Sequence, residues 1–162
     1  MATTLQPRPA AITLAALAAA APLLAMASER FAGLVPCALC LWQRWPYWVA
    51  VVIALVAAGL RSRLLLAAAG VVILGSAAVA GLHVGVEQGW WPSPLPACSA
   101  QVVTGAATVE DLMRGLAAAP SKPCDAPTYL IPDLPLSMAA MNGIYALALA
   151  ALALTWARRR TM

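Results

Sequence analysis

The chain has 162 residues, of which 63% are hydrophobic and only 10% charged, whereas soluble domains average about 25% charged residues. This composition excludes a soluble protein and indicates a single integral membrane domain, residues 1–162. The net charge of +4 does not indicate nucleic-acid binding, because the positive residues lie at the ends of apolar segments rather than on one solvated face.

Four segments have the roughly 20 apolar residues needed to cross a bilayer. We predict spans at about residues 10–27, 41–60, 64–86 and 136–157. The predicted fold class is therefore an all-α membrane protein, a bundle of four transmembrane helices. Only a tight turn fits between the second and third spans, so these two form an antiparallel hairpin.

The first span has a second interpretation. Arg8, the apolar stretch and the small residues Ala25-Met26-Ala27 also resemble a secretory signal with its cleavage site. Cleavage would leave three spans without changing the side on which the cysteines lie.

The charged residues predict the orientation of the bundle. Arginines without a neighbouring acidic residue flank the apolar segments on one side: Arg8, Arg61, Arg63, Arg158, Arg159 and Arg160. By the positive-inside rule this side, with both termini, is cytoplasmic. The two remaining loops, about 28–40 and 87–135, are expected outside, where thiols can be kept oxidised.

The second external loop, about 87–135, holds most of the prolines. The run from Trp90 to Pro96 excludes a regular helix or a central strand. Residues 108–119 are predicted as a short helix, with Thr108 as its cap and Pro120 at its end. This helix either packs locally or lies on the membrane surface, and the shortage of other apolar residues in the loop favours the surface.

Cys37 and Cys40 form a Cys-Ala-Leu-Cys pair. Its disulfide would close a very small ring, gain little from loop entropy and be suited to cycling. Pro36 suits the first position of a helix and would place both cysteines in the first turn of the second span, where a thiolate is favoured. Arg44, one turn beyond Cys40, either marks the interface or adds a functional charge, and its cost in an apolar span favours function.

Cys98 and Cys124 are far apart in the external loop. A bond between them would close a long, exposed segment accessible to a protein partner. It is either a structural staple or one half of a relay, and the Cys-X-X-Cys pair on the same side favours exchange between the pairs.

A metal site is not predicted, because structural zinc sites usually combine two closely spaced cysteine pairs and only one pair here is close. His83, the only histidine, lies near the outward end of the third span, where packing is its commoner role.

Net thiol oxidation needs an electron acceptor, and the sequence has no dinucleotide fingerprint, histidine pair or iron–sulfur cysteine set. The remaining candidate for the acceptor is a membrane quinone, which would reach Cys40 from the bilayer.

Three motifs resemble those of the DsbB family, the quinone-dependent oxidases of bacterial disulfide-bond formation. They are Pro-Cys-Ala-Leu-Cys-Leu-Trp-Gln-Arg at 36–44, Gly-Val-Glu-Gln-Gly-Trp-Trp-Pro at 85–92 and Pro-Cys-Asp at 123–125. The resemblance covers the chain from the first span to Ala157. It implies a multi-pass protein of the bacterial inner membrane with its cysteines in the periplasm.

The resemblance also implies a path for the electrons. A reduced, periplasmic DsbA-like oxidant attacks the loop disulfide and becomes joined to Cys98, and Cys124 then passes the electrons to Cys37. Cys40, with Arg44, faces ubiquinone or menaquinone.

Some family members have a histidine near the quinone just after the third span. His83, which falls a little earlier and inside the span, is the candidate for that place.

Two other functions fit parts of the sequence. One is a reductase resembling vitamin K epoxide reductase, although its active pair usually lies late in the chain. The other is a non-catalytic membrane assembly subunit whose cysteines form static bonds.

Overall fold

The computed structural model describes residues 7–95, 98, 108–110, 122–131 and 133–158. This part of the chain is helical or irregular, with no strand. Four of its helical segments are long and apolar enough to cross a membrane, which confirms the predicted all-α, four-span fold class. The predicted short helix at 108–119 lies mostly outside the described residues.

The first helix, α1 (Pro7–Ala32), is longer than the apolar segment that predicted it. The sequence predicted an external loop from residue 28, but the helix continues to Ala32 and ends before Gly33. Gly33 has a φ of 64°, a conformation that glycine adopts readily and that commonly terminates helices. The extension places Glu29 on the helix, where its side chain reaches Arg44 of the second span.

The second span is two helices, α2 (Ala38–Trp42) and α3 (Trp45–Leu60), where the sequence predicted one. Pro46 lies in the first turn of α3. Proline has no N–H for the carbonyl four residues earlier and its ring clashes with that carbonyl, which here belongs to Trp42, the last residue of α2. The resulting break at Gln43 and Arg44 turns two polar residues towards the other helices.

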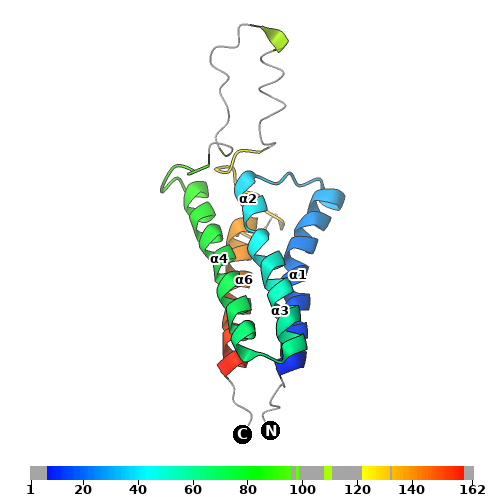
Figure 1. Ribbon diagram of the computed structural model, residues 1–162. Coiled ribbons are helices and arrows are strands. Elements are labelled where there is room, and N and C mark those ends of the chain that lie inside the picture. Colours follow the sequence, from blue (N-terminus) through cyan, green and yellow to red (C-terminus); the bar gives the residue numbers. More distant parts are fainter. Residues whose placement is uncertain (1–6, 96–97, 99–107, 111–121, 132, 159–162) are drawn as a thin grey trace.

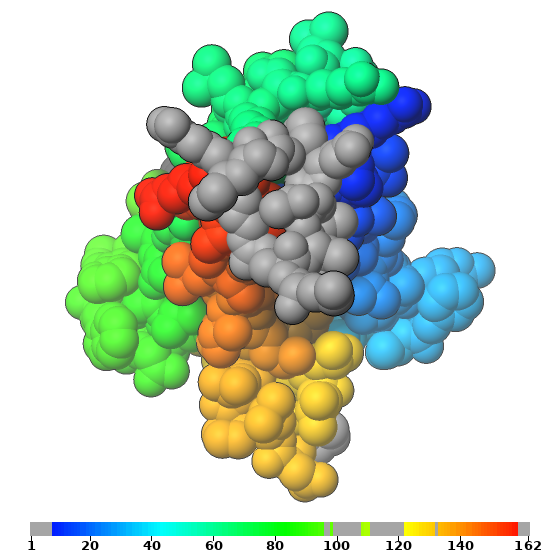
Figure 2. Space-filling view, turned by 90° about the horizontal axis from the view of Figure 1, so that it is seen from below, coloured from blue at the N-terminus to red at the C-terminus, as the bar shows by residue number. Residues whose placement is uncertain are grey.

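The remaining helices are α4 (Arg63–Glu87) and α6 (Met138–Arg158). α4 packs on α6 and α3, and α1 packs on α3 (Figures 1 and 2). The fourth adjacent pair, α1 and α6, packs less closely than these three pairs. The start of α1, the turn between α3 and α4, and the end of α6 share one end of the bundle. We call the opposite end, which carries α2 and Cys98, the cysteine end.

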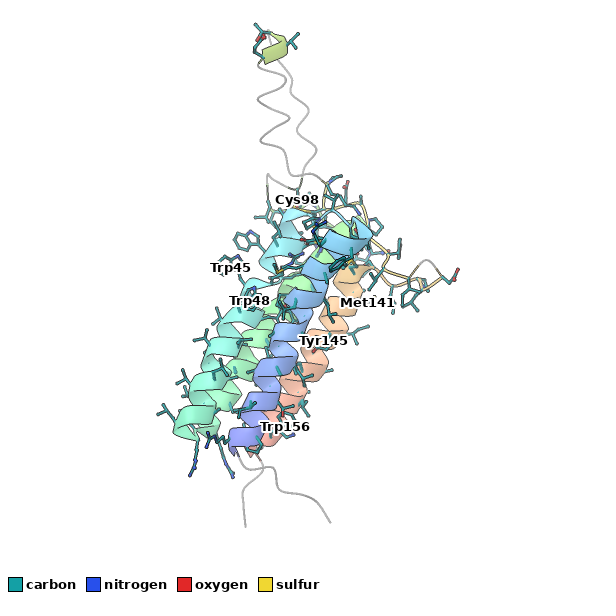
Figure 3. All side chains as sticks on the ribbon, turned by 90° about the vertical axis from the view of Figure 1, so that its right-hand side faces the viewer. Trp45, Trp48, Cys98, Met141, Tyr145 and Trp156 are labelled. Carbon is teal, nitrogen blue, oxygen red and sulfur yellow. A yellow bond between two sulfur atoms is a disulfide. The ribbon has the colours of Figure 1, made fainter. Side chains whose placement is uncertain are left out.

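Tryptophans lie near both ends of the bundle (Figure 3). Trp45 and Trp48, near the cysteine end, are 69% and 38% exposed, and Trp156 lies near the other end. Tryptophan is enriched at both membrane interfaces, so this arrangement fits a bundle that crosses the bilayer along its long axis.

The core of the bundle consists largely of alanine, with few large side chains. Small residues let membrane helices approach closely, and van der Waals contact then holds them together. α4 approaches α6 closely at Gly70, where an added Cβ would lie 2.9 Å from Cβ of Ala153 and 3.4 Å from the carbonyl oxygen of Ala150. Neither neighbour has a flexible end, so the helices would have to separate.

We therefore expect Gly70→Ala to destabilise the protein by about 1–3 kcal/mol, the usual cost of overpacking. Gly81→Ala is the matched control on the same helix, because an added Cβ there meets nothing within 4 Å. The control should be neutral or slightly stabilising, since alanine favours a helix over glycine. Thermal unfolding in detergent measures both variants, and equal melting temperatures would contradict the close packing of α4 on α6.

Candidate redox site

Cys37 caps the first turn of α2 with its own side chain. Its backbone is extended, with φ −90° and ψ 170°, and its sulfur accepts a hydrogen bond from the amide of Cys40 at 3.2 Å. Extended backbone and an accepting side chain are the properties of an N-cap residue. Pro36 therefore lies outside the helix rather than at its first position, and of the two cysteines only Cys40 lies in the first turn.

The two cysteines of this pair have different surroundings. Both are free thiols, and the sulfur of Cys37 donates to that of Cys40 at 2.8 Å. The hydrogen bond to Cys40, and then burial, raise the pKa of the Cys37 thiol well above its usual range. Cys37 is therefore the thiol that keeps its proton.

Cys98 and Cys124 form a disulfide, with Cα atoms 4.8 Å apart. The backbone amide of Cys124 also donates to the carbonyl of Cys98 at 3.2 Å. Together with Cys37, Leu39 and Val86, these cysteines form one buried cluster at the cysteine end. The structure thus brings residues from two separate loops into contact around three of the four cysteines.

The loop disulfide is not exposed, which corrects the sequence-based expectation. Cys98 is 3% exposed and Cys124 is fully buried, because both pack into the cluster with Leu39 and Val86 rather than at the tip of the loop. A protein that attacks this bond must first open the cluster.

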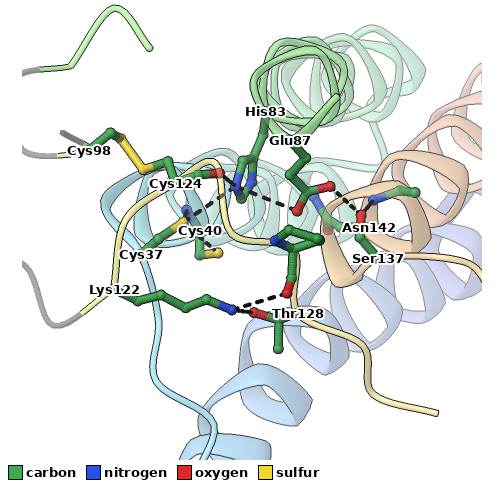
Figure 4. Close-up of polar contacts among 12 residues, drawn as sticks. Cys37, Cys40, His83, Glu87, Cys98, Lys122, Cys124, Thr128, Ser137 and Asn142 are labelled. Carbon is green, nitrogen blue, oxygen red and sulfur yellow. Dashed lines mark hydrogen bonds and ion pairs between the residues drawn. A yellow bond between two sulfur atoms is a disulfide. The ribbon is translucent and has the colours of Figure 1, made fainter. Parts of the chain in front are cut away.

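His83 lies in the same region, 2% exposed on the last turns of α4. Its Nε2 is 3.5 Å from the sulfur of Cys37 and 3.2 Å from the carbonyl oxygen of Cys124 (Figure 4). Gln43 bonds to its Nδ1 at 2.8 Å. The structure therefore places His83 against the sulfur atoms.

Arg44 is held by α1. Its guanidinium donates to the carboxylate of Glu29, and the two side chains are 16% and 27% exposed. The break in the second span makes Arg44 the N-cap residue of α3, so it is not on one continuous helix with Cys40 as predicted. Both residues nevertheless line the same cavity, so the predicted proximity survives although the predicted helical geometry does not.

This cavity, of about 290 Å³, opens between α1 and α6, which pack on each other less closely than α1 packs on α3 or α4 on α6. Its walls are mostly apolar: Ala21, Pro22, Leu24 and Ala25 of α1, and Met138, Ala139 and Met141 of α6. Met141 and Tyr145 lie along the α6 side that borders α1 in Figure 3. An apolar wall with a few convergent polar groups is typical of a small-molecule site.

The polar groups at this cavity come from α1, α2, α3, α6 and the break: Ser28, Cys40, Gln43, Arg44, Tyr47, Asn142 and Tyr145. His83 does not line it, although the sequence predicted His83 for a quinone site. The sequence-based reasoning did not single out Gln43 and Asn142. Each is an amide in a predominantly apolar segment, where polar groups are costly, and that signal could have identified them.

Three ligand atoms in this site are close enough for a metal. The sulfurs of Cys37 and Cys40 and a ring nitrogen of His83 lie within 4.8 Å of one another. A fourth protein ligand, which structural zinc sites need, is absent from this group in the described part of the chain. The absence of a metal stays a prediction.

The family model for disulfide bond formation protein DsbB matches residues 7–156. The chain belongs to the DsbB family. No curated protein and no solved structure matches it significantly. Membership identifies this DsbB-family protein as a membrane oxidoreductase of disulfide-bond formation.

Proposed function

We propose that this DsbB-family protein is a protein-disulfide:quinone oxidoreductase that reoxidises a periplasmic DsbA-like thiol oxidase. The observation that carries the proposal is the position of Cys40. Its sulfur lies 2.8 Å from that of Cys37 and its side chain lines an apolar cavity between α1 and α6. Cys40 thus connects the buried thiols with a site open to a lipid-soluble acceptor.

The reaction divides into thiol exchange and electron release. The reduced partner attacks the Cys98–Cys124 bond and becomes joined to Cys98, while Cys124 leaves as a thiolate. Cys124 then attacks Cys37 of the oxidised Cys37–Cys40 pair, and Cys40 leaves with the electron pair. The role of each cysteine follows from its match to the family motif, and the burial of Cys37 among the loop cysteines supports exchange between the pairs.

The cavity fits a quinone headgroup by its chemistry. It combines apolar walls with a fixed cation, Arg44, and with the polar side chains of Gln43, Asn142 and Tyr145. A bound ubiquinone or menaquinone would accept two electrons and two protons. Cys40 would supply electrons at its sulfur, and Arg44 would stabilise negative charge beside it.

The arginine-rich end of the bundle supports the proposed orientation. Four arginines lie away from the cysteine end (Figure 1). They are Arg8 at the start of α1, Arg61 and Arg63 between α3 and α4, and Arg158 at the end of α6. By the positive-inside rule we place this end in the cytoplasm of a bacterium and the cysteines in the periplasm.

Thiol trapping in quinone-depleted cells tests this proposal. We expect reduced Cys37 and Cys40 to accumulate when quinone synthesis is blocked, because the electrons then have no acceptor, and to disappear when a quinone is supplied. Alkylation of acid-quenched cells followed by mass spectrometry counts both states. Cysteines that stay oxidised without quinone would instead indicate a static assembly subunit.

A further inference from the structure

His83 lies between the two cysteine pairs and contacts both. Its Nε2 is 3.5 Å from the sulfur of Cys37 and 3.2 Å from the backbone carbonyl of Cys124. These are the two cysteines between which the proposed relay must form and break a bond. The histidine is 2% exposed, so its contacts with protein groups decide where its proton lies.

A chain of hydrogen bonds settles which ring nitrogen carries the hydrogen. The hydroxyl of Ser76 donates to the backbone carbonyl of Gln43 at 2.8 Å, so its oxygen is left to accept from Nδ2 of Asn142 at 3.1 Å. The same Nδ2 donates to Oε1 of Gln43 at 2.7 Å. Nε2 of Gln43 must then donate to Nδ1 of His83, which leaves the hydrogen of a neutral imidazole on Nε2.

Tyr47 supports the same arrangement from the far side. Its hydroxyl donates to Oδ1 of Asn142 at 2.8 Å, so the amide of Asn142 is fixed at both ends. The chain therefore starts at the polar wall of the cavity and ends with an N–H directed at Cys37 and at the Cys124 carbonyl.

We propose that His83 couples the two cysteine pairs: its Nε2–H holds the backbone of Cys124 beside Cys37 and stabilises the Cys37 sulfur when that sulfur becomes negative. The inference rests on the proposed relay and names a residue for its exchange step. It differs from a place for His83 at the quinone, since the histidine does not line the cavity while Gln43 and Asn142 do.

The step that needs this donor can be written in full. After the partner has been released, the thiolate of Cys98 attacks Cys124 in the Cys37–Cys124 bond. The Cys98–Cys124 bond forms, the Cys37–Cys124 bond breaks, and the electron pair leaves on the sulfur of Cys37. Hydrogen bonds to an ionised group are about twice as strong as neutral ones, so the N–H favours this leaving sulfur.

Glu87 is the acidic group nearest to this nitrogen among the described residues. Its Oε1 lies 3.8 Å from Nε2 of His83, which is too long for a hydrogen bond, and its Oε2 accepts from Ser137. Glu87 therefore leaves the N–H available to Cys37 and Cys124.

Two variants of His83 separate loss of the donor from loss of packing. His83→Leu removes the N–H, and His83→Gln keeps a donor on a side chain of similar reach. In the first measurement, the oxidised, quinone-free protein is mixed with a reduced thioredoxin-fold dithiol protein. Acid quenching and mass spectrometry then measure electron transfer to Cys37 and Cys40. We expect transfer to slow roughly tenfold or more in His83→Leu and to recover at least partly in His83→Gln.

The second measurement starts after the exchange step. Dithiothreitol first reduces Cys37 and Cys40, and the reductant is then removed. The reduced protein is mixed with a short-chain quinone, and a single turnover is measured. We expect His83→Leu to match the unsubstituted protein within about twofold. Equal losses in both measurements, or no loss in the first, would overturn the role of His83. An unsubstituted protein inactive in both would instead contradict the proposed function.

Gln43→Glu tests the hydrogen-bond chain without shortening a side chain. A carboxylate accepts rather than donates at Nδ1, so the hydrogen would move to Nδ1 and Nε2 would face Cys37 without one. We expect exchange between the pairs to slow at least as much as in His83→Leu. Gln88→Glu, at an exposed position after α4, adds the same charge as a control and should exchange normally. Normal exchange in Gln43→Glu would overturn the proposal.

Discussion

Cys40→Ser is expected to abolish partner-dependent quinone reduction by the purified protein. A hydroxyl cannot form the Cys37–Cys40 disulfide, and Cys40 is the cysteine that lines the apolar cavity. Cys37 cannot replace it, because Cys37 is 3% exposed and packs among the loop cysteines. The variant should still form the Cys98–Cys124 bond, which lies in the other loop.

The absorbance change of ubiquinone or menaquinone analogues in detergent measures this loss, with a reduced DsbA-like protein as donor. Leu41→Ala is a suitable control, since Leu41 is adjacent in the chain, 45% exposed and not part of the cavity lining. The control should retain its activity. Turnover in Cys40→Ser above the uncatalysed rate would refute the assignment of Cys40 as the electron donor.

The second large effect is expected at the loop pair, where Cys98→Ser and Cys124→Ser should behave in opposite ways. Without Cys124 the bond between the partner and Cys98 has no resolving thiol within the protein, so the mixed disulfide should accumulate. Without Cys98 the partner has no sulfur to join, and the mixed disulfide should be missing. Both variants should lose turnover.

Non-reducing gels of acid-quenched samples detect the mixed disulfide by its mass. A reductant added after quenching should release the partner and provides the control for a disulfide link. If Cys98→Ser traps the partner and Cys124→Ser does not, the roles of the two cysteines are reversed. Since Cys98 is buried, the amount trapped also reports how readily the cluster opens.

The match to the DsbB family bears on the two other functions that the sequence left open. Family membership favours thiol oxidation over epoxide reduction and over a static assembly role. The buried contact of His83 with both pairs also supports exchange, because a static staple at Cys98 and Cys124 would not need a donor directed at Cys37.

Local composition determined the four helices, and it predicted their orientation in the membrane and the class of chemistry. Runs of about 20 apolar residues demand helices in a bilayer, and arginines with no acidic residue beside them in the sequence predict which side one end of the bundle faces. The Pro-Cys-X-X-Cys motif is local as well, so its redox character could be predicted from neighbouring residues. Pro46 also carried a readable signal for the break after Trp42, which the prediction of one continuous span overlooked.

Tertiary structure alone decided how the site is assembled. The bonds from Gln43 to His83 and to Asn142 join residues 40 and 99 positions apart, and Arg44 meets Glu29 only because α1 extends beyond its apolar core. The burial of Cys98 and the cavity between α1 and α6 likewise depend on how the helices and the loop pack. Apolar runs and charge patterns involve residues that are close in the sequence, so they can be read from the sequence. These contacts join residues that are far apart in the sequence, so they depend on which helix faces pack together.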